Sequence, residues 1–251
     1  MNPVIESLKS HRTIRAFRPD RIDDAQLNAI LEAGTRAATC FQPYSFLVID
    51  DPEILKEIAM YAVPAAVLLT IDLHRYQRYL TLHDAPIHID SAFHLLHVHW
   101  DAILALQNVV VAAESLGLGT VYIGRVHMMD LHELLELPEN VFPAGLVLIG
   151  YPAGERSEKR PYRLPMEAVV HRNRYRVPTD EELEAWYGPY KELFDRQYEN
   201  LTDEDRQRLA AEGVQSGLQR LSHLEGSFYQ EADAATLGNL RRGGFYVDNW
   251  G

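Results

Sequence analysis

Two arginines that flank a hydroxyl group are the strongest chemical feature of the sequence. Arg12 and Arg15 lie on either side of Thr13, close to the N-terminus. A guanidinium group stays charged at neutral pH and can donate to two phosphate oxygens at once, so this spacing suits the binding of a terminal phosphate. A second cationic segment, residues 159–163, could close on the same anion. For either segment alone, arginines solvated at the surface are the alternative.

The distribution of charge favours a small anionic ligand over a polyanionic partner. The chain has a formal net charge of −12 at pH 7. Residues 9–21 contain five basic and one acidic side chain, and residues 151–176 contain seven basic and three acidic side chains. The cations are thus concentrated in two segments of an acidic protein. We expect no binding to nucleic acids or to anionic membranes.

The histidines form a second group that could do chemistry. Five of the 11 histidines lie within residues 83–99. On a helix His94 and His97 would share a face but His99 would not, and the spacing to Asp101 fits no zinc motif. We therefore expect no metal site and interpret these histidines as partly exposed or interface residues. A metal-dependent hydrolase built on them is the remote alternative.

Common motifs for covalent catalysis and for nucleotide binding are absent from the sequence. It contains no G-x-S-x-G, no phosphate loop and no G-x-G-x-x-G. The single cysteine, Cys40, has no neighbouring base in the sequence, and we expect it to be a small buried hydrophobic residue. One cysteine cannot form a disulfide within the chain, and no secretion signal is evident, so we expect a reducing, cytoplasmic location.

Hydrophobic periodicity and helix caps indicate the elements that must position these residues. Helices are expected to begin after Asn2, Asp23 and Asp51, whose side chains can cap a helix N-terminus. Further helices are expected over residues 90–116 and 130–136. Apolar runs predict strands over residues 46–49, 65–71, 121–123 and 146–149. Short strands among helices, with few hairpin signals, indicate an α+β protein of mixed layers.

The length and composition permit one large domain with an extension. The chain has 251 residues, of which 47% are hydrophobic. We expect a first domain over residues 1–176 and a helical C-terminal extension over residues 177–251. Helices of the extension are expected over residues 179–198, 202–221 and 233–240. The longest clean apolar run is far shorter than the roughly 20 residues that span a membrane, so no membrane association is expected.

Four motifs resemble the nitroreductase family, in the same order and with similar spacing. They are His11-Arg12-Thr13-Ile14-Arg15-Ala16-Phe17, Phe41-Gln42-Pro43-Tyr44-Ser45-Phe46, residues 112–124 (AAESLGLGTVYIG), and Gly150-Tyr151-Pro152 followed by Arg163-Leu164-Pro165. The resemblance covers roughly residues 5–175. The chain length and the helical tail are similar to the longer branch of the family, the oxygen-insensitive nitroreductases and NAD(P)H-flavin reductases.

The resemblance implies a central, mostly antiparallel sheet flanked by helices, and a homodimer that binds two FMN molecules in its interface. It also implies which residues bind the cofactor. The phosphate-binding opening corresponds to His11, Arg12, Thr13 and Arg15, and the second phosphate cation to Arg163. The loop beside the flavin ring corresponds to Tyr122, Ile123 and Gly124, with Arg125 next to it. Thr39 and Gln42 correspond to residues that reach the flavin of the partner chain.

The same resemblance implies the activity. NADPH or NADH would reduce FMN, which would reduce a small-molecule acceptor such as a nitroaromatic compound, a quinone or a free flavin. Because the cofactor carries the chemistry, no catalytic side chain is expected. The physiological acceptor and the choice between NADH and NADPH stay open. A flavin-binding module of the same fold, with a specialised or lost activity, is the alternative.

Three features depart from the family pattern. Residues 61–64 are apolar apart from one tyrosine hydroxyl, where the longer branch carries polar residues at the edge of the flavin. Arg125 replaces a glycine, which would narrow or recharge the pocket. The altered spacing before Arg163 leaves open whether Lys159 or Arg160 is the further cation of the phosphate site.

Overall fold

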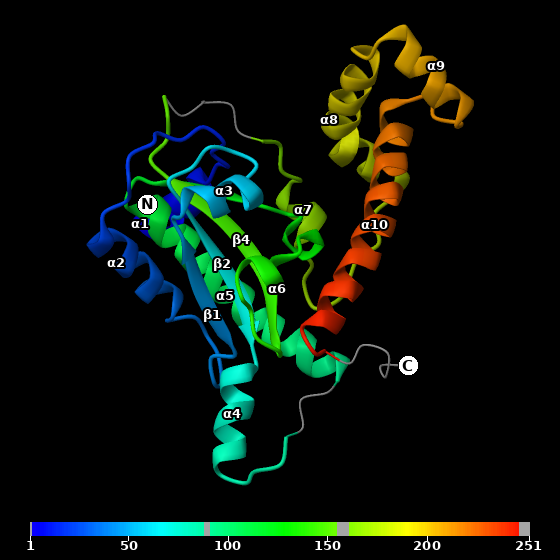
Figure 1. The fold of residues 1–251 in the computed structure, drawn as a ribbon. Coiled ribbons are helices and arrows are strands. Elements are labelled where there is room, and N and C mark those ends of the chain that lie inside the picture. The colour runs from blue at the N-terminus through cyan, green and yellow to red at the C-terminus, as the bar shows by residue number, and fades with distance from the viewer. Residues whose placement is uncertain (1, 88–90, 155–160, 246–251) are drawn as a thin grey trace. The chain divides into compact units, whose positions relative to one another are not determined.

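The computed structural model describes residues 2–87, 91–154 and 161–245, and its first compact unit is built on a four-stranded sheet (Figure 1). The strands are β1 (Tyr44–Ile49), β2 (Ala65–Asp72), β3 (Gly119–Tyr122) and β4 (Val141–Gly150). They lie in the order β1-β2-β4-β3, and every pairing is antiparallel. The expected α+β class and the central antiparallel sheet are confirmed.

Both faces of the sheet are covered, so the two central strands are apolar on both sides. Helices α5 (Ala92–Ser115) and α2 (Asp24–Gly34) contribute to the hydrophobic cluster on one face. Helices α3 (Pro52–Ile58) and α6 (Leu131–Leu134), with the 3-10 turn η1 (Val126–Met128), contribute to the cluster on the other face. Strands β2 and β4 are buried along nearly their whole length as a result.

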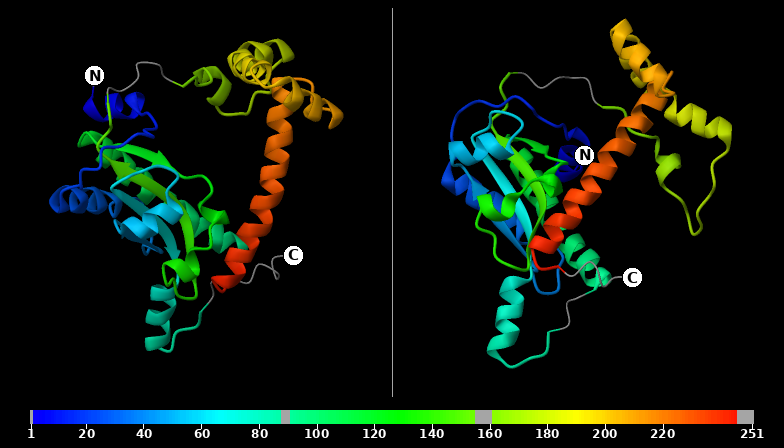
Figure 2. Two further views of the ribbon diagram at one scale, coloured as in Figure 1. Left: turned by 45° about the horizontal axis from the view of Figure 1, so that its top comes forward. Right: turned by 45° about the vertical axis from the view of Figure 1, so that its right-hand side comes forward.

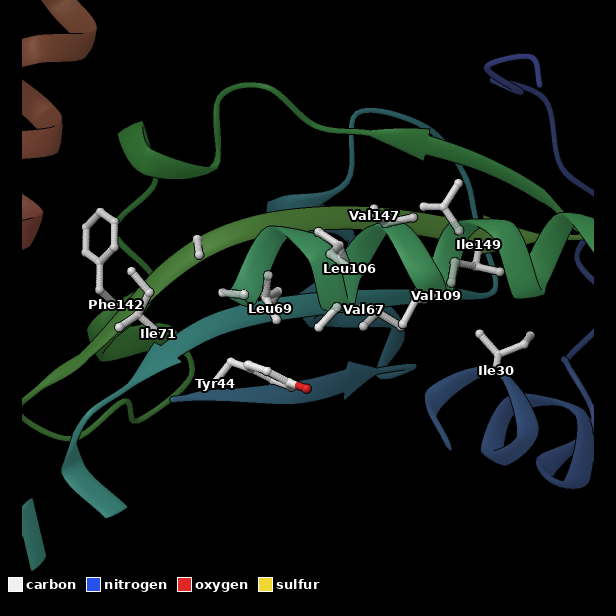
Figure 3. Close-up of a cluster of buried hydrophobic side chains, with 14 of the residues drawn as sticks. Ile30, Tyr44, Val67, Leu69, Ile71, Leu106, Val109, Phe142, Val147 and Ile149 are labelled. Carbon is white, nitrogen blue, oxygen red and sulfur yellow. The ribbon is translucent and has the colours of Figure 1, made fainter. Parts of the chain in front are cut away.

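Small residues allow α5 to approach the sheet and α2 closely. Ala102 of α5 is fully buried, and a Cβ added to Gly145 of β4 would lie 2.6 Å from Leu106 Cδ2. A Cβ on Gly34, at the end of α2, would lie 2.6 Å from Val109 of α5. Figure 3 shows Leu106 and Val109 among the buried side chains of the strands. The position of α5 is therefore fixed by backbone-to-side-chain packing as well as by apolar burial.

Helix capping and strand positions agree with the expectations from sequence. The side chains of Asn2, Asp23 and Asp51 accept hydrogen bonds from first-turn amides of α1 (Pro3–Ser10), α2 and α3. Each expected strand is present, with β1, β3 and β4 beginning earlier than expected. Helix α4 (His74–Leu82) was not expected from sequence. It projects from one end of the sheet (Figures 1 and 2) and contains no fully buried residue.

The C-terminal helices differ from the prediction. The chain forms two compact units, residues 1–157 with 232–251 and residues 158–231. The helices are α7 (Met166–Val169), α8 (Asp180–Glu199), α9 (Asp203–Ala211) and α10 (Gly217–Arg242). The single helix expected over residues 202–221 is wrong, because Gly213 adopts a left-handed conformation with φ of 84° and follows the end of α9. The expected short helix over 233–240 is the last part of α10, and the division after residue 176 stays a prediction.

Helix α5 is apolar beyond what the sheet requires. Within the described residues, Phe93–Ser115 is the one segment long and apolar enough, by composition, to cross a membrane. Its inner side is buried against the sheet, as is expected of an apolar helix in the core of a globular protein. Its outer side leaves large side chains exposed in the single chain, among them Phe93 (73%), Leu96 (58%) and Trp100 (63%). The inner packing accounts for only part of this composition, and the outer side is left for another apolar surface to cover.

Two histidines lie close together where the last part of α10 meets η1. The ring of His127 stacks on Phe142 at 5.4 Å between centroids, and the His99 ring lies 6.2 Å away. The backbone oxygen of His127 accepts a hydrogen bond from the buried amide of Asn239 at 2.6 Å. Burial lowers the pKa of both histidines, and their mutual repulsion lowers the pKa of His127 further.

We expect stability to fall on acidification through this pair. Because the folded-state pKa values lie below the ordinary value of about 6.5, the unfolded chain takes up protons first as the pH falls. This contribution to stability is fully present above that ordinary value and is lost as the pH falls toward the lowered values. Melting temperatures measured from pH 7.5 to 5.5 should fall less steeply for His127→Phe, which keeps the stacking on Phe142. The exposed control His83→Phe should keep the wild-type slope, and equal slopes in all three proteins would contradict the assignment.

Candidate functional site

The segment after α1 runs along the free edge of β3. The Ile14 N–H donates to the Thr120 oxygen at 2.9 Å, and Thr13 and Thr120 form a parallel bridge. A Cβ on Gly119 would lie 2.7 Å from the Ile14 side chain, so only glycine permits this close approach. The dark blue segment beside the sheet in Figure 2 is therefore held by backbone hydrogen bonds. This arrangement sets the direction of the expected phosphate-binding residues.

A carboxylate of α5 fastens the same segment. Glu114 Oε1 accepts a hydrogen bond from His11 Nδ1 at 2.7 Å and another from Thr120 Oγ1 at 2.9 Å. The Glu114 side chain is 10% exposed and that of His11 is 35% exposed. Because the shared acceptor is nearly buried, both hydrogen bonds are made in a medium that strengthens them. Glu114 thus joins the end of α5, the start of β3 and the residue before Arg12.

The cations of this segment form a donor set that fits a phosphate. Arg12 is half-buried and Arg15 is exposed, and Thr13 lies between them with its side chain accessible. Within the described part of the chain Arg15 makes no ion pair. Arg18, by contrast, pairs with Asp20 at 3.4 Å and stacks on the Tyr151 ring. The charge of Arg15, which no ion pair within the described residues neutralises, therefore lies in the segment beside β3, where we expect the anion to bind.

The turn after β3 offers one unused backbone donor. The Ile123 N–H donates to the Leu146 oxygen at 2.9 Å and its side chain is buried, so this amide belongs to the sheet. The Gly124 N–H makes no hydrogen bond to any described residue. A Cβ on Gly124 would meet nothing within 4 Å, so open space borders the backbone there. Gly124 and the exposed Arg125 are thus the parts of this turn that can face a ligand.

Tyr122 closes the end of β3 as a neutral phenol. Its hydroxyl donates to Gln107 Oε1 of α5 at 3.2 Å. Burial and the nearby Glu114 carboxylate raise the pKa of Tyr122 to about 12. The ring is partly exposed and keeps its proton at neutral pH, so it can stack on a ligand or donate a hydrogen bond but cannot serve as a base.

Thr39 and Gln42 lie in a separate, hydrogen-bonded loop before β1. The Thr39 hydroxyl donates to Asp101 Oδ2 at 2.8 Å and accepts from the Gln42 N–H at 3.0 Å. Gln42 adopts a positive φ of 52°, and its side chain donates to the Thr35 oxygen at 3.1 Å. Arg75 of α4 donates to the Gln42 carbonyl at 2.8 Å. The strained backbone at Gln42 is held by hydrogen bonds on both sides.

The two groups of predicted residues are fastened to different turns of α5. The segment 11–15 is fastened to α5 at Glu114 and the loop 39–42 at Asp101. Thirteen residues of helix separate the two, which corresponds to about 20 Å. The predicted cofactor-binding residues of the first unit therefore form two half-sites.

The predicted flavin-edge residues line a groove on the first unit. It has a volume of about 790 Å³. Its lining residues are Phe17, Arg18, Pro19, Arg21, Asp50, Pro52, Leu55, Lys56 and residues 59–64. Its walls are mainly apolar, and a Cβ on Gly150 would lie 2.8 Å from Pro64, which marks the close packing at its floor. Tyr61 supplies the hydroxyl that the sequence predicts, so the apolar character expected of residues 61–64 is present in the structure.

Other predicted residues have varied outcomes. Arg160 lies outside the described residues, and Arg163 belongs to the second unit, where it donates to the Tyr162 oxygen at 3.2 Å. Their part in the phosphate site stays a prediction. Cys40 is exposed, so the expectation of a buried cysteine is wrong. It lies on the surface loop that joins α2 to β1, whose polar backbone groups keep it in contact with solvent.

The histidine cluster lies partly outside the described residues. His88 falls there, His83 and His97 are exposed, and His94 and His99 are half-buried. No group of three metal-ligating side chains occurs among the residues that the structure describes. The absence of a metal site stays a prediction.

Sequence reasoning missed the two carboxylates that orient the half-sites. Asp101 and Glu114 are the acidic residues of α5, a helix that is otherwise dominated by Ala, Leu and Val. Acidic side chains within an apolar helix were the available signal, because burying a carboxylate is costly unless hydrogen bonds offset the cost. Arg75 was missed as well, because α4 was not expected.

Comparison with known proteins shows the family of the chain. The model of the Nitroreductase family matches residues 8–151. An FMN reductase (NAD(P)H) of Bacillus subtilis is 36% identical over 235 residues, 88% of this chain and 93% of the relative. An NADPH-dependent oxidoreductase of Staphylococcus haemolyticus is 33% identical over 238 residues, 88% of this chain and 94% of the relative. The solved structure of NADPH:FMN oxidoreductase from Vibrio harveyi, complexed with NAD+, is similar with a TM-score of 0.67 and 29% identity, covering 90% of this chain and 97% of that one. The family match covers more than half of the chain, and the protein belongs to the nitroreductase family.

Proposed function

We propose that this protein is an FMN-dependent NAD(P)H oxidoreductase that reduces small molecules such as nitroaromatics, quinones or free flavins. The observation that carries the proposal is that segment 11–15 and the turn at Gly124 both lie along β3. The parallel bridge between Thr13 and Thr120 directs Arg15 toward the end of β3, where the unused Gly124 amide lies. Cations for a phosphate and an open backbone donor for a planar ring are the two features that FMN requires. The names of the similar proteins support the same cofactor and donor.

The residues of this chain would bind and orient the cofactor. Arg12 and Arg15 would pair with the phosphate, and His11 would stay turned by Glu114 toward the same anion. The Gly124 amide would donate to the reactive edge of the ring. FMN, when bound, supplies the two-electron chemistry between nicotinamide and acceptor, so no side chain has to act as acid or base.

Arg125 would set the charge at the mouth of the site. It follows Gly124 directly and is exposed. A cation there favours anionic acceptors and the 2′-phosphate of NADPH over NADH. The exposed thiol of Cys40 suits a reducing compartment, so we place the protein in the cytoplasm.

We further propose a homodimer, because each chain holds two half-sites and leaves apolar helix faces uncovered. Helix α1 exposes Val4 (59%) and Leu8 (51%), and α5 exposes Leu104 (50%) in addition to the aromatic residues at its start. An obligate interface of this kind buries about 2,000 Å² or more in total. A second chain would cover these faces and bring its loop 39–42 to the site made by segment 11–15.

Anaerobic reduction tests the activity. The protein reconstituted with FMN should be yellow and should lose its flavin absorbance on addition of NADPH under anaerobic conditions. Because donor and acceptor would share one face of the ring, initial rates at several acceptor concentrations should give parallel double-reciprocal lines. The apolar residues 61–64 favour the alternative of a flavin-binding module, for which a yellow protein would not be bleached by NADPH or NADH. A protein that takes up no FMN would contradict both.

Substitution of one arginine tests the phosphate site. Arg12→Ala should weaken FMN binding about 10- to 150-fold, because a charge-assisted hydrogen bond contributes about 1.5–3 kcal/mol. Arg18→Ala is the matched control from the same segment, since Arg18 is occupied by Asp20 and Tyr151. Fluorescence titration of the apoprotein with FMN measures both. Equal dissociation constants for the two variants would contradict the assignment.

Analytical ultracentrifugation tests the homodimer. The wild type should sediment with twice the mass of the 28.6 kDa chain. Leu104→Glu should shift it toward the monomer and lower its FMN content, because a charge on α5 would be buried in the interface. Met60→Glu, at a side chain of similar exposure on the groove, should leave the mass unchanged. A wild-type monomer that retains FMN would contradict the proposal.

A further inference from the structure

We infer that Asp101 is a positioning residue for the cofactor: its carboxylate turns the Thr39 hydroxyl so that the oxygen can only accept a hydrogen bond from FMN held by the partner subunit. The inference rests on the proposed function and assigns a role to a residue of α5 that lies outside the four family motifs. It predicts the direction of one hydrogen bond and the chain that supplies it.

Asp101 is placed where a carboxylate is costly. It is 8% exposed and is the one charged side chain among the buried residues that the structure describes. Its neighbours on the inner side of α5, Val98 and Ala102, are fully buried in the hydrophobic cluster. A carboxylate loses its hydration at such a position, and hydrogen bonds must offset the loss. The hydrogen bond from Thr39 at 2.8 Å supplies part of that compensation.

The hydrogen bonds around Thr39 leave one lone pair of its oxygen unused. A hydroxyl has one proton and two acceptor positions. An ionised carboxylate can only accept, so the Thr39 proton is directed to Asp101 Oδ2. The Gln42 N–H occupies one acceptor position at 3.0 Å. The remaining acceptor position suits a hydroxyl or N–H donor of the cofactor, and a hydroxyl free to rotate would offer it only part of the time.

The loop does not depend on Asp101 alone for its fold. Arg75 donates to the carbonyl oxygens of Gln42 and Tyr44 at 2.8 and 3.1 Å. It also donates to Ser45 Oγ at 3.0 Å. Loss of the Asp101 charge should therefore change the direction of the Thr39 hydroxyl while the backbone of the loop stays in place. This separates a positioning role from a purely structural one.

The helix that carries Asp101 also shows which subunit it serves. Asp101 and Glu114 lie about 20 Å apart along α5, and each orients a different half-site. Because the two anchors are this far apart on one helix, the inference assigns the two half-sites of a single FMN to two chains. Asp101 would thus act on the cofactor whose phosphate is bound by the Arg12 of the other chain.

A double-mutant cycle in the full-length protein tests the role. FMN dissociation constants are measured by fluorescence for Asp101→Asn, Thr39→Val and the double variant, with melting temperatures of the apoproteins. Each single variant should weaken binding about 3- to 10-fold, as expected for one net hydrogen bond, and the double variant should be no weaker than Thr39→Val. Thr39→Ser, which keeps the hydroxyl, should bind like the wild type. Asn108→Ala, on the same helix, removes a hydrogen bond to Ala33 and should not change FMN affinity.

Mixed dimers test the chain that supplies the contact. A dimer of one Arg12→Ala chain and one Asp101→Asn chain should bind one FMN with wild-type affinity, because one site contains both changes and the other contains neither. Two weakened sites per dimer, additive losses in the cycle, or wild-type affinity in Asp101→Asn would each overturn the inference. If Asp101→Asn does not fold, equal binding by Thr39→Ser and Thr39→Val overturns it. A wild type that binds no FMN would instead overturn the proposed function and this inference with it.

Discussion

Burial of α5 against the sheet is the constraint on which the rest of the structure depends. The helix can lie this close only because Gly145 of β4 and Gly34 of α2 have no side chains to keep it away. Once it is seated, its turn at Glu114 reaches segment 11–15 and its turn at Asp101 reaches the loop before β1. The packing of the core therefore sets the directions of polar groups that no local propensity would fix.

The carboxylates of Glu114 and Asp101 both accept hydrogen bonds, but they orient different segments of the chain. Glu114 binds two donors at the edge of the sheet and raises the pKa of Tyr122, so it keeps negative charge near a segment that is otherwise cationic. That charge tempers the repulsion among the cations of segment 11–15 without entering an ion pair with Arg15. Asp101 instead accepts from a neutral hydroxyl in the core. In both cases a largely buried acceptor fixes the direction of a donor.

Much of the fold could be predicted from the sequence, because its signals are local. Caps at Asp23 and Asp51 and apolar runs such as 65–71 correspond to elements that the structure contains. The predictions failed where burial carries no local signal. Helix α4 contains no fully buried residue, Cys40 is exposed because its loop crosses the surface, and Gly213 ends a helix that periodicity would continue. For the site, the family motifs predict which residues face a ligand, and that assignment stays a prediction. The residues that hydrogen-bond to them come from α5 and α4 and become evident only when distant segments are packed together.

The geometry of α5 also separates the two groups of predicted residues. A helix advances about 1.5 Å and turns about 100° per residue, so the thirteen residues from Asp101 to Glu114 amount to about 20 Å along the axis and about 140° around it. The loop 39–42 and segment 11–15 are thus held at different positions along α5 and on different sides of it. Each segment is also held in a second place. A backbone hydrogen bond ties segment 11–15 to β3, and the Arg75 side chain of α4 donates to the Gln42 carbonyl of loop 39–42. In the proposed homodimer, the two segments that contact one FMN would come from two copies of the helix.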